Sequence, residues 1–147
     1  MKKRYFFLLA IGVCIALGGC NRHGGRQGLG GTVTFDGQPM SAGAIVFYPE
    51  PGTLGPTAGG KIVDGEFTVD AEKGTMEGTF RVQISATRKT GKKVFDPTAE
   101  MLDPGSTDGM MDEIVQYIPA RYNKQSELTA DVVDGGENRF EFALSSE

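Results

Sequence analysis

Residues 79–86, TFRVQISA, decide the fold. If this segment is extended, Phe80, Val82 and Ile84 point to one side and the polar side chains between them point to the other. Apolar residues that recur with a period of two are typical of a β-strand with one buried face, whereas a helix repeats them every three or four positions. The segment therefore predicts a strand that lies against a hydrophobic core.

Similar alternation occurs on both sides of this strand. Shorter runs of the same kind are residues 32–35, 44–48, 61–63, 66–70, 128–132 and 139–144. Asp36-Gly37, Asp64-Gly65 and Asp134-Gly135 follow such runs, and Asp-Gly favours a tight turn in which the Asp side chain bonds nearby backbone. No amphipathic helix is long enough to cover a sheet, so the strands must pack on one another. We therefore predict an all-β fold, a seven-stranded antiparallel β-sandwich.

The beginning of the chain has the pattern of an export signal. Residues 1–20, MKKRYFFLLAIGVCIALGGC, have a basic start and an apolar stretch too short for a mature transmembrane helix, which needs about twenty residues. The closing Leu17-Gly18-Gly19-Cys20 resembles the bacterial lipobox, which implies that residues 1–19 are a lipoprotein signal peptide and that Cys20 is lipidated. An ordinary secreted protein and an uncleaved anchor are the alternatives.

Such a lipoprotein is exported and anchored to the cell membrane, facing the periplasm or the cell surface. An Asp directly after the lipidated Cys would favour retention at the inner membrane. This chain has Asn21 there, which weakly favours the outer membrane. Residues 20–30 are expected to be the lipidated Cys20 and a flexible tether, because 21–30 contain four Gly and one apolar side chain. We assign the sandwich domain to residues 31–147.

Composition limits the chemistry of this domain. Without residues 1–19 the chain has 12 basic and 19 acidic residues, a net charge of −7, which argues against nucleic acid as a partner. Cys14 and Cys20 precede the domain, and the single His, His23, lies in the tether. A Ser or Cys nucleophile with a His base therefore has no counterpart in the domain. We expect no cofactor, no metal, no catalytic residues and no enzymatic activity.

Residues 88–116 are predicted to be a long loop. A connection of 29 residues exceeds the usual two to six, and such loops are usually functional or disordered. It begins with basic residues and continues with acidic ones. The possible partner contacts in it are Arg88, Lys89, Lys92, Lys93, Asp108, Asp112 and Glu113. The expected partner is an envelope protein or a polysaccharide.

Three kinds of ligand compete with a structural role for the side chains of this segment. Asp103, Asp108, Asp112 and Glu113 could bind calcium, but their spacing matches no calcium loop. Met101, Met110 and Met111 could bind cuprous copper, but they lack a partner His or Cys. The lysines could meet anionic lipid or polysaccharide, but a solvated charge run is the favoured explanation for them. Solvated loop residues and packing methionines are the preferred interpretation.

Tyrosines are the candidates for a sugar-binding surface. Aromatic platforms for sugars usually contain Trp, which this chain lacks, so Tyr48, Tyr117 and Tyr122 remain. For Tyr122 we expect packing, with its hydroxyl bonded to the backbone.

Five motifs, in this order, resemble those of small bacterial lipoproteins with a carboxypeptidase regulatory-like, or transthyretin-like, domain. They are Val33-x-x-Asp36-Gly37-x-Pro39, Ala44-x-Val46-x-x-Pro49, Gly65-x-Phe67, Gly78-x-Phe80-x-Val82 and the closing segment 119–144. The resemblance implies a prealbumin-like sandwich and says little about function. The zinc ligands of metallocarboxypeptidases belong to their peptidase domain, and the tether His cannot replace them.

The sequence thus favours a non-enzymatic, lipid-anchored envelope lipoprotein. It would serve as a structural or protein-binding module, through residues 88–116 or through an exposed sheet edge. A carbohydrate-binding module is the first alternative. A carboxylate-dependent hydrolase is the second, and it requires two buried carboxylates that converge in a cleft.

Overall fold

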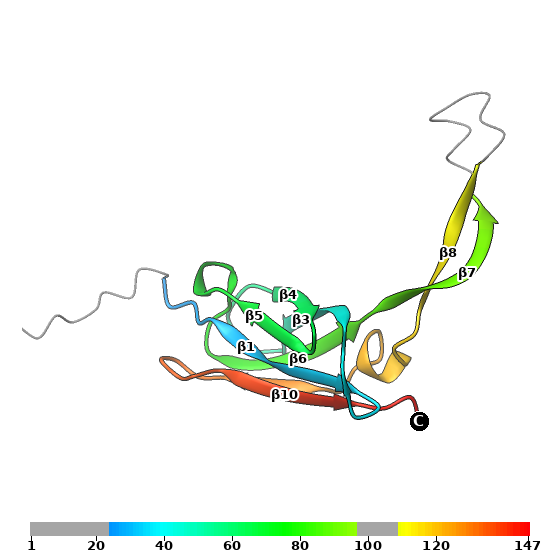
Figure 1. The fold of residues 1–147 in the computed structure, drawn as a ribbon. Helices are drawn as coiled ribbons and strands as arrows, with labels where there is room; N and C mark the ends of the chain where they lie inside the picture. The colour runs from blue at the N-terminus through cyan, green and yellow to red at the C-terminus, as the bar shows by residue number, and fades with distance from the viewer. Residues whose placement is uncertain (1–23, 97–108) are drawn as a thin grey trace, which may run out of the picture.

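The computed structural model describes residues 24–96 and 109–147, whose regular structure consists of strands and two short 3-10 turns. The strands are β1 (Leu29–Phe35), β2 (Gln38–Pro39), β3 (Ala42–Pro49), β4 (Ala58–Val63), β5 (Glu66–Val69), β6 (Gly78–Ser85), β7 (Thr87–Phe95), β8 (Met110–Gln116), β9 (Thr129–Val132) and β10 (Arg139–Leu144). The turns are η1 (Ala71–Lys73) and η2 (Ala120–Tyr122). The predicted all-β class is confirmed (Figure 1). In the described ranges, no helix is long and apolar enough to cross a membrane.

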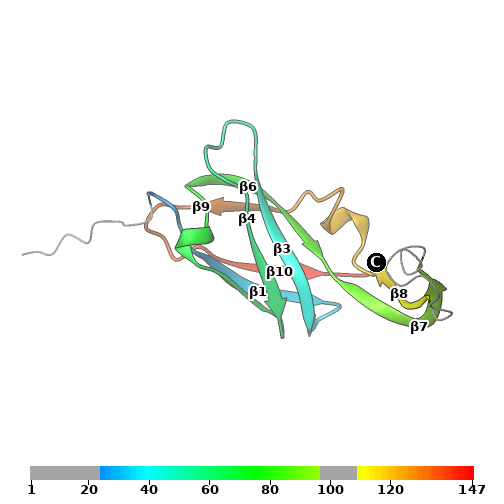
Figure 2. The same cartoon turned by 90° about the horizontal axis from the view of Figure 1, so that it is seen from above.

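The main sheet curls over itself to make a sandwich. Its strands follow the order β10-β1-β5-β4-β3-β6-β9, and the short β2 pairs with β1. Figure 2 shows β3 and β4 crossing over β1 and β10, so that the sheet forms two layers. The β-sandwich is confirmed, although the described residues form ten strands rather than seven, with β7 and β8 in a small sheet of their own.

The core lies between the two layers and is built from alternating residues. In β6, Phe80, Val82 and Ile84 are completely buried, as the period of two predicts. The ring centroid of Phe47, in β3, lies 6.0 Å from that of Phe67 and 5.9 Å from that of Phe140. These ring contacts join the two layers. Other buried apolar side chains include Leu29, Val33, Ile45, Ile62, Ile118, Val132, Phe142 and Leu144.

Two of the Asp-Gly pairs form the predicted hairpin turns. Asp36 and Gly37 have φ angles of 49° and 77° and join β1 to β2, while Asp64 and Gly65 have φ angles of 50° and 82° and join β4 to β5. Two consecutive positive φ angles match the twist of antiparallel strands, and Asp-Gly tolerates them well. Local sequence therefore determines both hairpins.

The third pair, Asp134-Gly135, turns the chain without forming a hairpin. The strands on either side of it have different neighbours, because β9 pairs with β6 and β10 pairs with β1. The expected local bonding of the Asp side chains is wrong at two positions. Asp134 accepts a 2.6 Å hydrogen bond from Gln27, and Asp36 accepts one of 2.8 Å from the backbone of Ser146. These carboxylates join distant segments instead.

The tether prediction is wrong at its C-terminal end. Gln27 forms an isolated bridge with Thr75, and Leu29 begins β1 with a buried side chain. Gly31 pairs with Phe140, and a Cβ atom built on it would lie 1.8 Å from the Phe140 carbonyl oxygen. The glycine here serves close packing rather than flexibility. Cys20, His23 and the rest of residues 1–23 lie outside the described residues.

The predicted loop at 88–116 is also wrong for most of its length. Strands β7 and β8 pair with each other and form a two-stranded antiparallel arm that projects from the sandwich (Figure 1). Since most side chains on both strands are exposed, the segment has no buried face and hence no period-two pattern. Residues 97–108, which include Met101, Asp103 and Asp108, lie outside the described residues.

Candidate functional site

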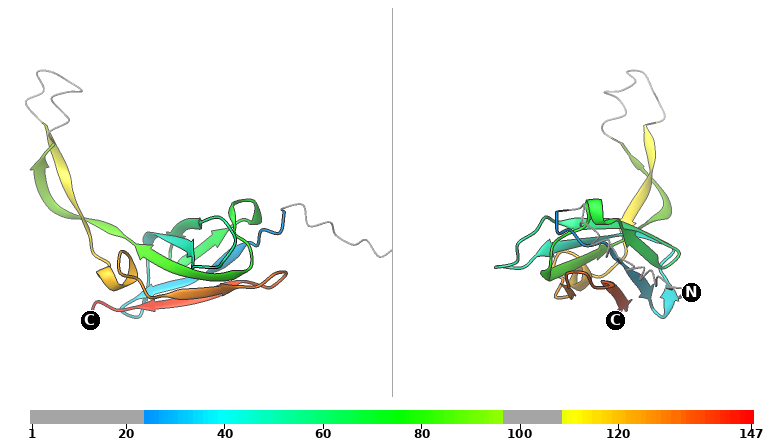
Figure 3. Two further views of the ribbon diagram at one scale, coloured as in Figure 1. Left: turned by 180° about the vertical axis from the view of Figure 1, so that it is seen from behind. Right: turned by 90° about the vertical axis from the view of Figure 1, so that its left-hand side faces the viewer.

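The arm, residues 87–95 and 110–116, is the candidate site because it extends away from the body. Strand β7 follows β6 almost directly, and nine residues at about 3.3 Å each give it a length of about 30 Å. Figure 3 shows the arm leaving the sandwich in two further views. A two-stranded ribbon on its own is only marginally stable in water, so a partner surface would stabilise the arm.

Strand register places three exposed apolar side chains on one face of the arm, while Val94, Met111 and Val115 lie on the other face. Phe95 lies opposite Met110, Lys93 opposite Asp112, and Lys89 opposite Ile114. Residues that face each other across an antiparallel pair, and those two apart along a strand, lie on the same face. Phe95, Ile114 and Met110 are 63%, 54% and 48% exposed. We call these six residues the arm face. Large apolar side chains with this exposure are candidates for contact with a partner.

Asp112 binds two lysines at the centre of the arm face. Its Oδ2 atom lies 2.6 Å from Nζ of Lys89, and its Oδ1 atom lies 2.7 Å from Nζ of Lys93. The hydrogen bond from Lys89, followed by that from Lys93, lowers the pKa of Asp112 to about 2. The same carboxylate raises the pKa of Lys89. One carboxylate thus clamps the two sides of the bulge between Lys89 and Lys93.

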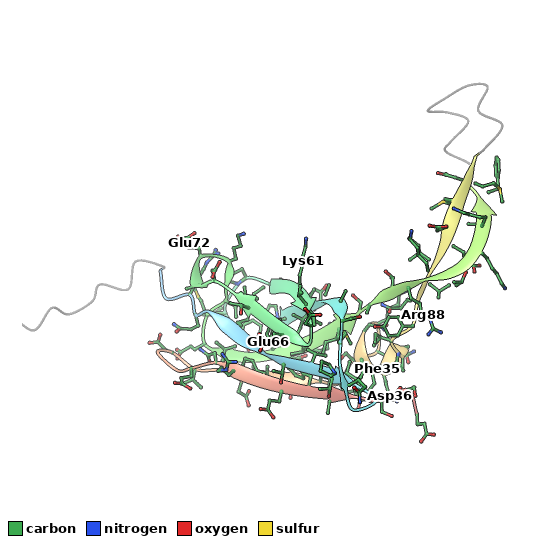
Figure 4. All side chains as sticks on the ribbon, in the orientation of Figure 1. Phe35, Asp36, Lys61, Glu66, Glu72 and Arg88 are labelled. Atoms are coloured by element: carbon green, nitrogen blue, oxygen red, sulfur yellow. The ribbon has the colours of Figure 1, made fainter. Side chains whose placement is uncertain are left out.

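The base of the arm is bonded to the sandwich. The guanidinium of Arg88 lies 5.6 Å from the ring centroid of Tyr117, whose ring in turn meets Phe35 edge to face at 5.5 Å. Figure 4 shows Arg88 where the arm joins the body, close to Phe35. The side-chain oxygen of Gln116 accepts hydrogen bonds from the backbone of Ala86 at 3.0 Å and from Ile118 at 3.1 Å. These contacts fix the direction in which the arm leaves the body.

The structure brings together most of the predicted contact residues. Arg88, Lys89, Lys92 and Lys93 lie on β7, and Asp112 and Glu113 lie on β8, where Glu113 accepts a 2.5 Å hydrogen bond from Thr90. Asp108 lies outside the described residues. Sequence reasoning missed Phe95 and Ile114. Val94-Phe95 and Ile114-Val115, two apolar pairs in a polar segment, are the signal that could have found them.

The three tyrosines that the structure describes all have intramolecular partners. Tyr48 lies under the guanidinium of Arg81 at 5.9 Å, and Tyr117 lies between Arg88 and Phe35. The hydroxyl of Tyr122 accepts a 3.2 Å hydrogen bond from the backbone of Ser145, which confirms the prediction for this residue. No specific feature of these rings favours sugar binding.

The carboxylates of the described residues do not form a buried pair. In residues 24–96 and 109–147, the buried polar side chains are Gln27, Thr75, Ser126 and Asn138. The same residues contain no group of three or more His, Cys, Asp or Glu side chains arranged to hold a metal ion. The condition set for a carboxylate-dependent hydrolase is therefore not met in this part of the chain.

Replacing Asp112 by asparagine is expected to loosen the arm without unfolding the body. A carboxyl group whose pKa is lowered in the folded state stabilises the structure around it when the pH is above its ordinary pKa, 3.8. This contribution disappears as the pH falls through about 2. In the wild type, backbone order in β7 should therefore decrease between pH 4 and pH 2, and Asp112→Asn should show the loosened state throughout this range. NMR order parameters of the arm amides measure the effect.

Asp64→Asn is the control for this variant, because Asp64 lies in a turn of the main sheet where Asn is also tolerated. It should leave arm order unchanged. Equal arm order in Asp112→Asn and wild type at pH 6 would show that the lysine clamp does not hold the arm.

Comparisons of the chain with protein-family models, with curated proteins and with solved structures found no match.

Proposed function

We propose that this protein is a non-enzymatic, lipid-anchored module of the cell envelope that binds another protein through its arm. The observation that carries the proposal is the arm face itself, in which Phe95, Met110 and Ile114 are exposed on a ribbon fixed at its base. Aromatic and long apolar side chains dominate the energy of protein interfaces once water is excluded. The arm has the composition of such a contact.

Charge supports an acidic partner surface. The arm has four basic residues and two acidic ones, whereas the rest of the described sandwich, residues 24–86 and 117–147, has seven basic and thirteen acidic residues. Basic side chains are thus concentrated on the projecting element. Long-range attraction by such a patch raises the rate of encounter with an acidic surface and weakens as salt increases.

The remaining parts of the proposal come from the sequence. The lipobox-like Leu17-Gly18-Gly19-Cys20 supports export and lipidation at Cys20. The absence of His and Cys from residues 24–147 supports a non-enzymatic role, because the common nucleophilic mechanisms need one or both. A lipid anchor at one end and a binding arm at the other would allow the protein to hold a partner near the membrane.

The test is affinity capture from solubilised envelope with the double variant Phe95→Ala, Ile114→Ala. We expect capture of the specific partner to fall at least about tenfold, since interface aromatic side chains are common hot spots. Val63→Ala is the matched control, because Val63 is 58% exposed but lies on the main sheet. Identical partner lists for the wild type and the double variant would reject the arm as the contact surface.

A further inference from the structure

The end of the sandwich where the chain enters carries its own exposed apolar cluster. Leu54, Val133 and Met76 are 80%, 59% and 36% exposed and lie around an open hollow of about 580 Å³. They come from three separate loops: between β3 and β4, between β9 and β10, and just before β6. We call these three residues the apolar rim. It is separate from the arm face, which lies on another sheet.

Contacts of Gln27 place the apolar rim beside the chain's entry point. Gln27 pairs with Thr75, the residue before Met76, through a backbone hydrogen bond of 2.6 Å. Its side chain donates to Asp134, the residue after Val133, at 2.6 Å and accepts from the backbone of Gly135 at 3.1 Å. The chain therefore enters the fold between two of the loops that form the apolar rim.

Chain length limits how far this end can lie from a lipid on Cys20. Gly24, the first described residue, lies four positions after Cys20, and even a fully extended chain spans at most about 3.6 Å per residue. The connection thus reaches no more than about 14 Å. In Figure 2 the chain enters at one end of the molecule and the arm lies at the other. The anchored end and the apolar rim would face the same membrane surface.

We propose that the apolar rim rests on the bilayer that holds the lipidated Cys20, so that the arm points away from this membrane. The inference uses the proposed anchor but does not depend on what the arm binds. Leu54, Met76 and Val133 would reach the headgroup region, where apolar side chains leave water without needing a protein partner. A short tether makes this contact effectively intramolecular.

Charge selects the kind of lipid. Glu77 lines the hollow, and Asp131, Asp134 and Glu137 lie on or just after β9, next to Val133. Near the entry point, Arg26 donates a hydrogen bond to the backbone oxygen of Glu72, so one basic and one acidic residue lie beside the start of the ribbon (Figure 4). Anionic headgroups would be repelled by this end. The occupant is therefore a zwitterionic lipid surface.

The experiment places a single tryptophan in a chain that otherwise has none. The mature chain, residues 20–147, is coupled through Cys20 to a maleimide lipid. This lipid is embedded in vesicles of phosphatidylcholine whose acyl chains are brominated. We expect Leu54→Trp and Val133→Trp to lose at least about half of their fluorescence relative to vesicles without bromine. Val63→Trp and Phe95→Trp, on the main sheet and on the arm face, should keep theirs.

Two results would overturn the inference. The first is Leu54→Trp emission that brominated lipid leaves unchanged, or that it quenches no more than the emission of Phe95→Trp. The second is stronger quenching when about a third of the phosphatidylcholine is replaced by phosphatidylglycerol, since the acidic end predicts weaker quenching. Because the lipid is attached chemically, neither result bears on the partner of the arm, and failure of the arm variants in affinity capture does not affect this test.

Discussion

Gly31→Ala is expected to lower the free energy of unfolding by about 3 kcal/mol or more, because it forces a strained backbone and a clash at once. Gly31 has a φ angle of 150°, a conformation that side chains with a Cβ rarely adopt. Its Cβ would meet the carbonyl oxygen of Phe140 at 1.8 Å, and that atom belongs to the neighbouring strand rather than to a movable side chain. Strands β1 and β10 would have to separate.

Gly30→Ala is the matched control for this prediction. A Cβ at position 30 would meet its nearest atom, the carbonyl oxygen of Phe67, at 3.6 Å, which is ordinary van der Waals contact. Urea unfolding followed by circular dichroism should show a large loss for Gly31→Ala and a small change for Gly30→Ala. Equal midpoints for the two variants would mean that β1 and β10 do not pair as closely as the structure has them.

The local parts of the fold could be predicted from the sequence. Strand β6 shows its period of two because one face meets the core and the other meets solvent. The turns at Asp36-Gly37 and Asp64-Gly65 follow from the preference of these residues for positive φ angles. In both cases the signal lies within a few residues, so no knowledge of distant segments is needed.

Long-range pairing could not be predicted in the same way. The first and last long strands of the main sheet, β1 and β10, lie side by side and parallel, and no local pattern indicates which strands will be neighbours. Asp134-Gly135 shows the same limit. Its sequence favours a turn, but only the pairing of β9 with β6 and of β10 with β1 makes the turn a connection between layers.

The sequence predicted the charged residues of the candidate site but not its exposed apolar residues. Lys89, Lys93 and Asp112 stood out in the sequence, and the structure joins them in one cluster. Phe95 and Ile114 did not stand out, because exposed apolar side chains on a ribbon follow no burial period. The periodic pattern of apolar residues in a sequence identifies side chains that are buried in the core. Exposed apolar side chains on a binding surface follow no such period, so this pattern does not reveal them.

Phe47→Ala and Phe95→Ala should therefore have opposite effects on stability and on binding. Phe47 is completely buried between Phe67 and Phe140, and its truncation is expected to cost about 3–5 kcal/mol, a large share of the 5–15 kcal/mol typical of a domain. Thermal unfolding by circular dichroism should show a Tm lower by about 10–20 °C. Phe95 is 63% exposed, and its truncation should change the stability by less than about 0.5 kcal/mol.

The comparison is informative because the same atoms are removed in both variants. If Phe95 contacts only a partner, Phe95→Ala should keep the wild-type Tm and weaken partner capture, whereas the Phe47→Ala protein that remains folded at low temperature should still capture the partner. A similar fall in Tm for both variants would show that the arm packs on the body in solution. The projecting arm would then be part of the core, and its apolar side chains would not need a partner to cover them.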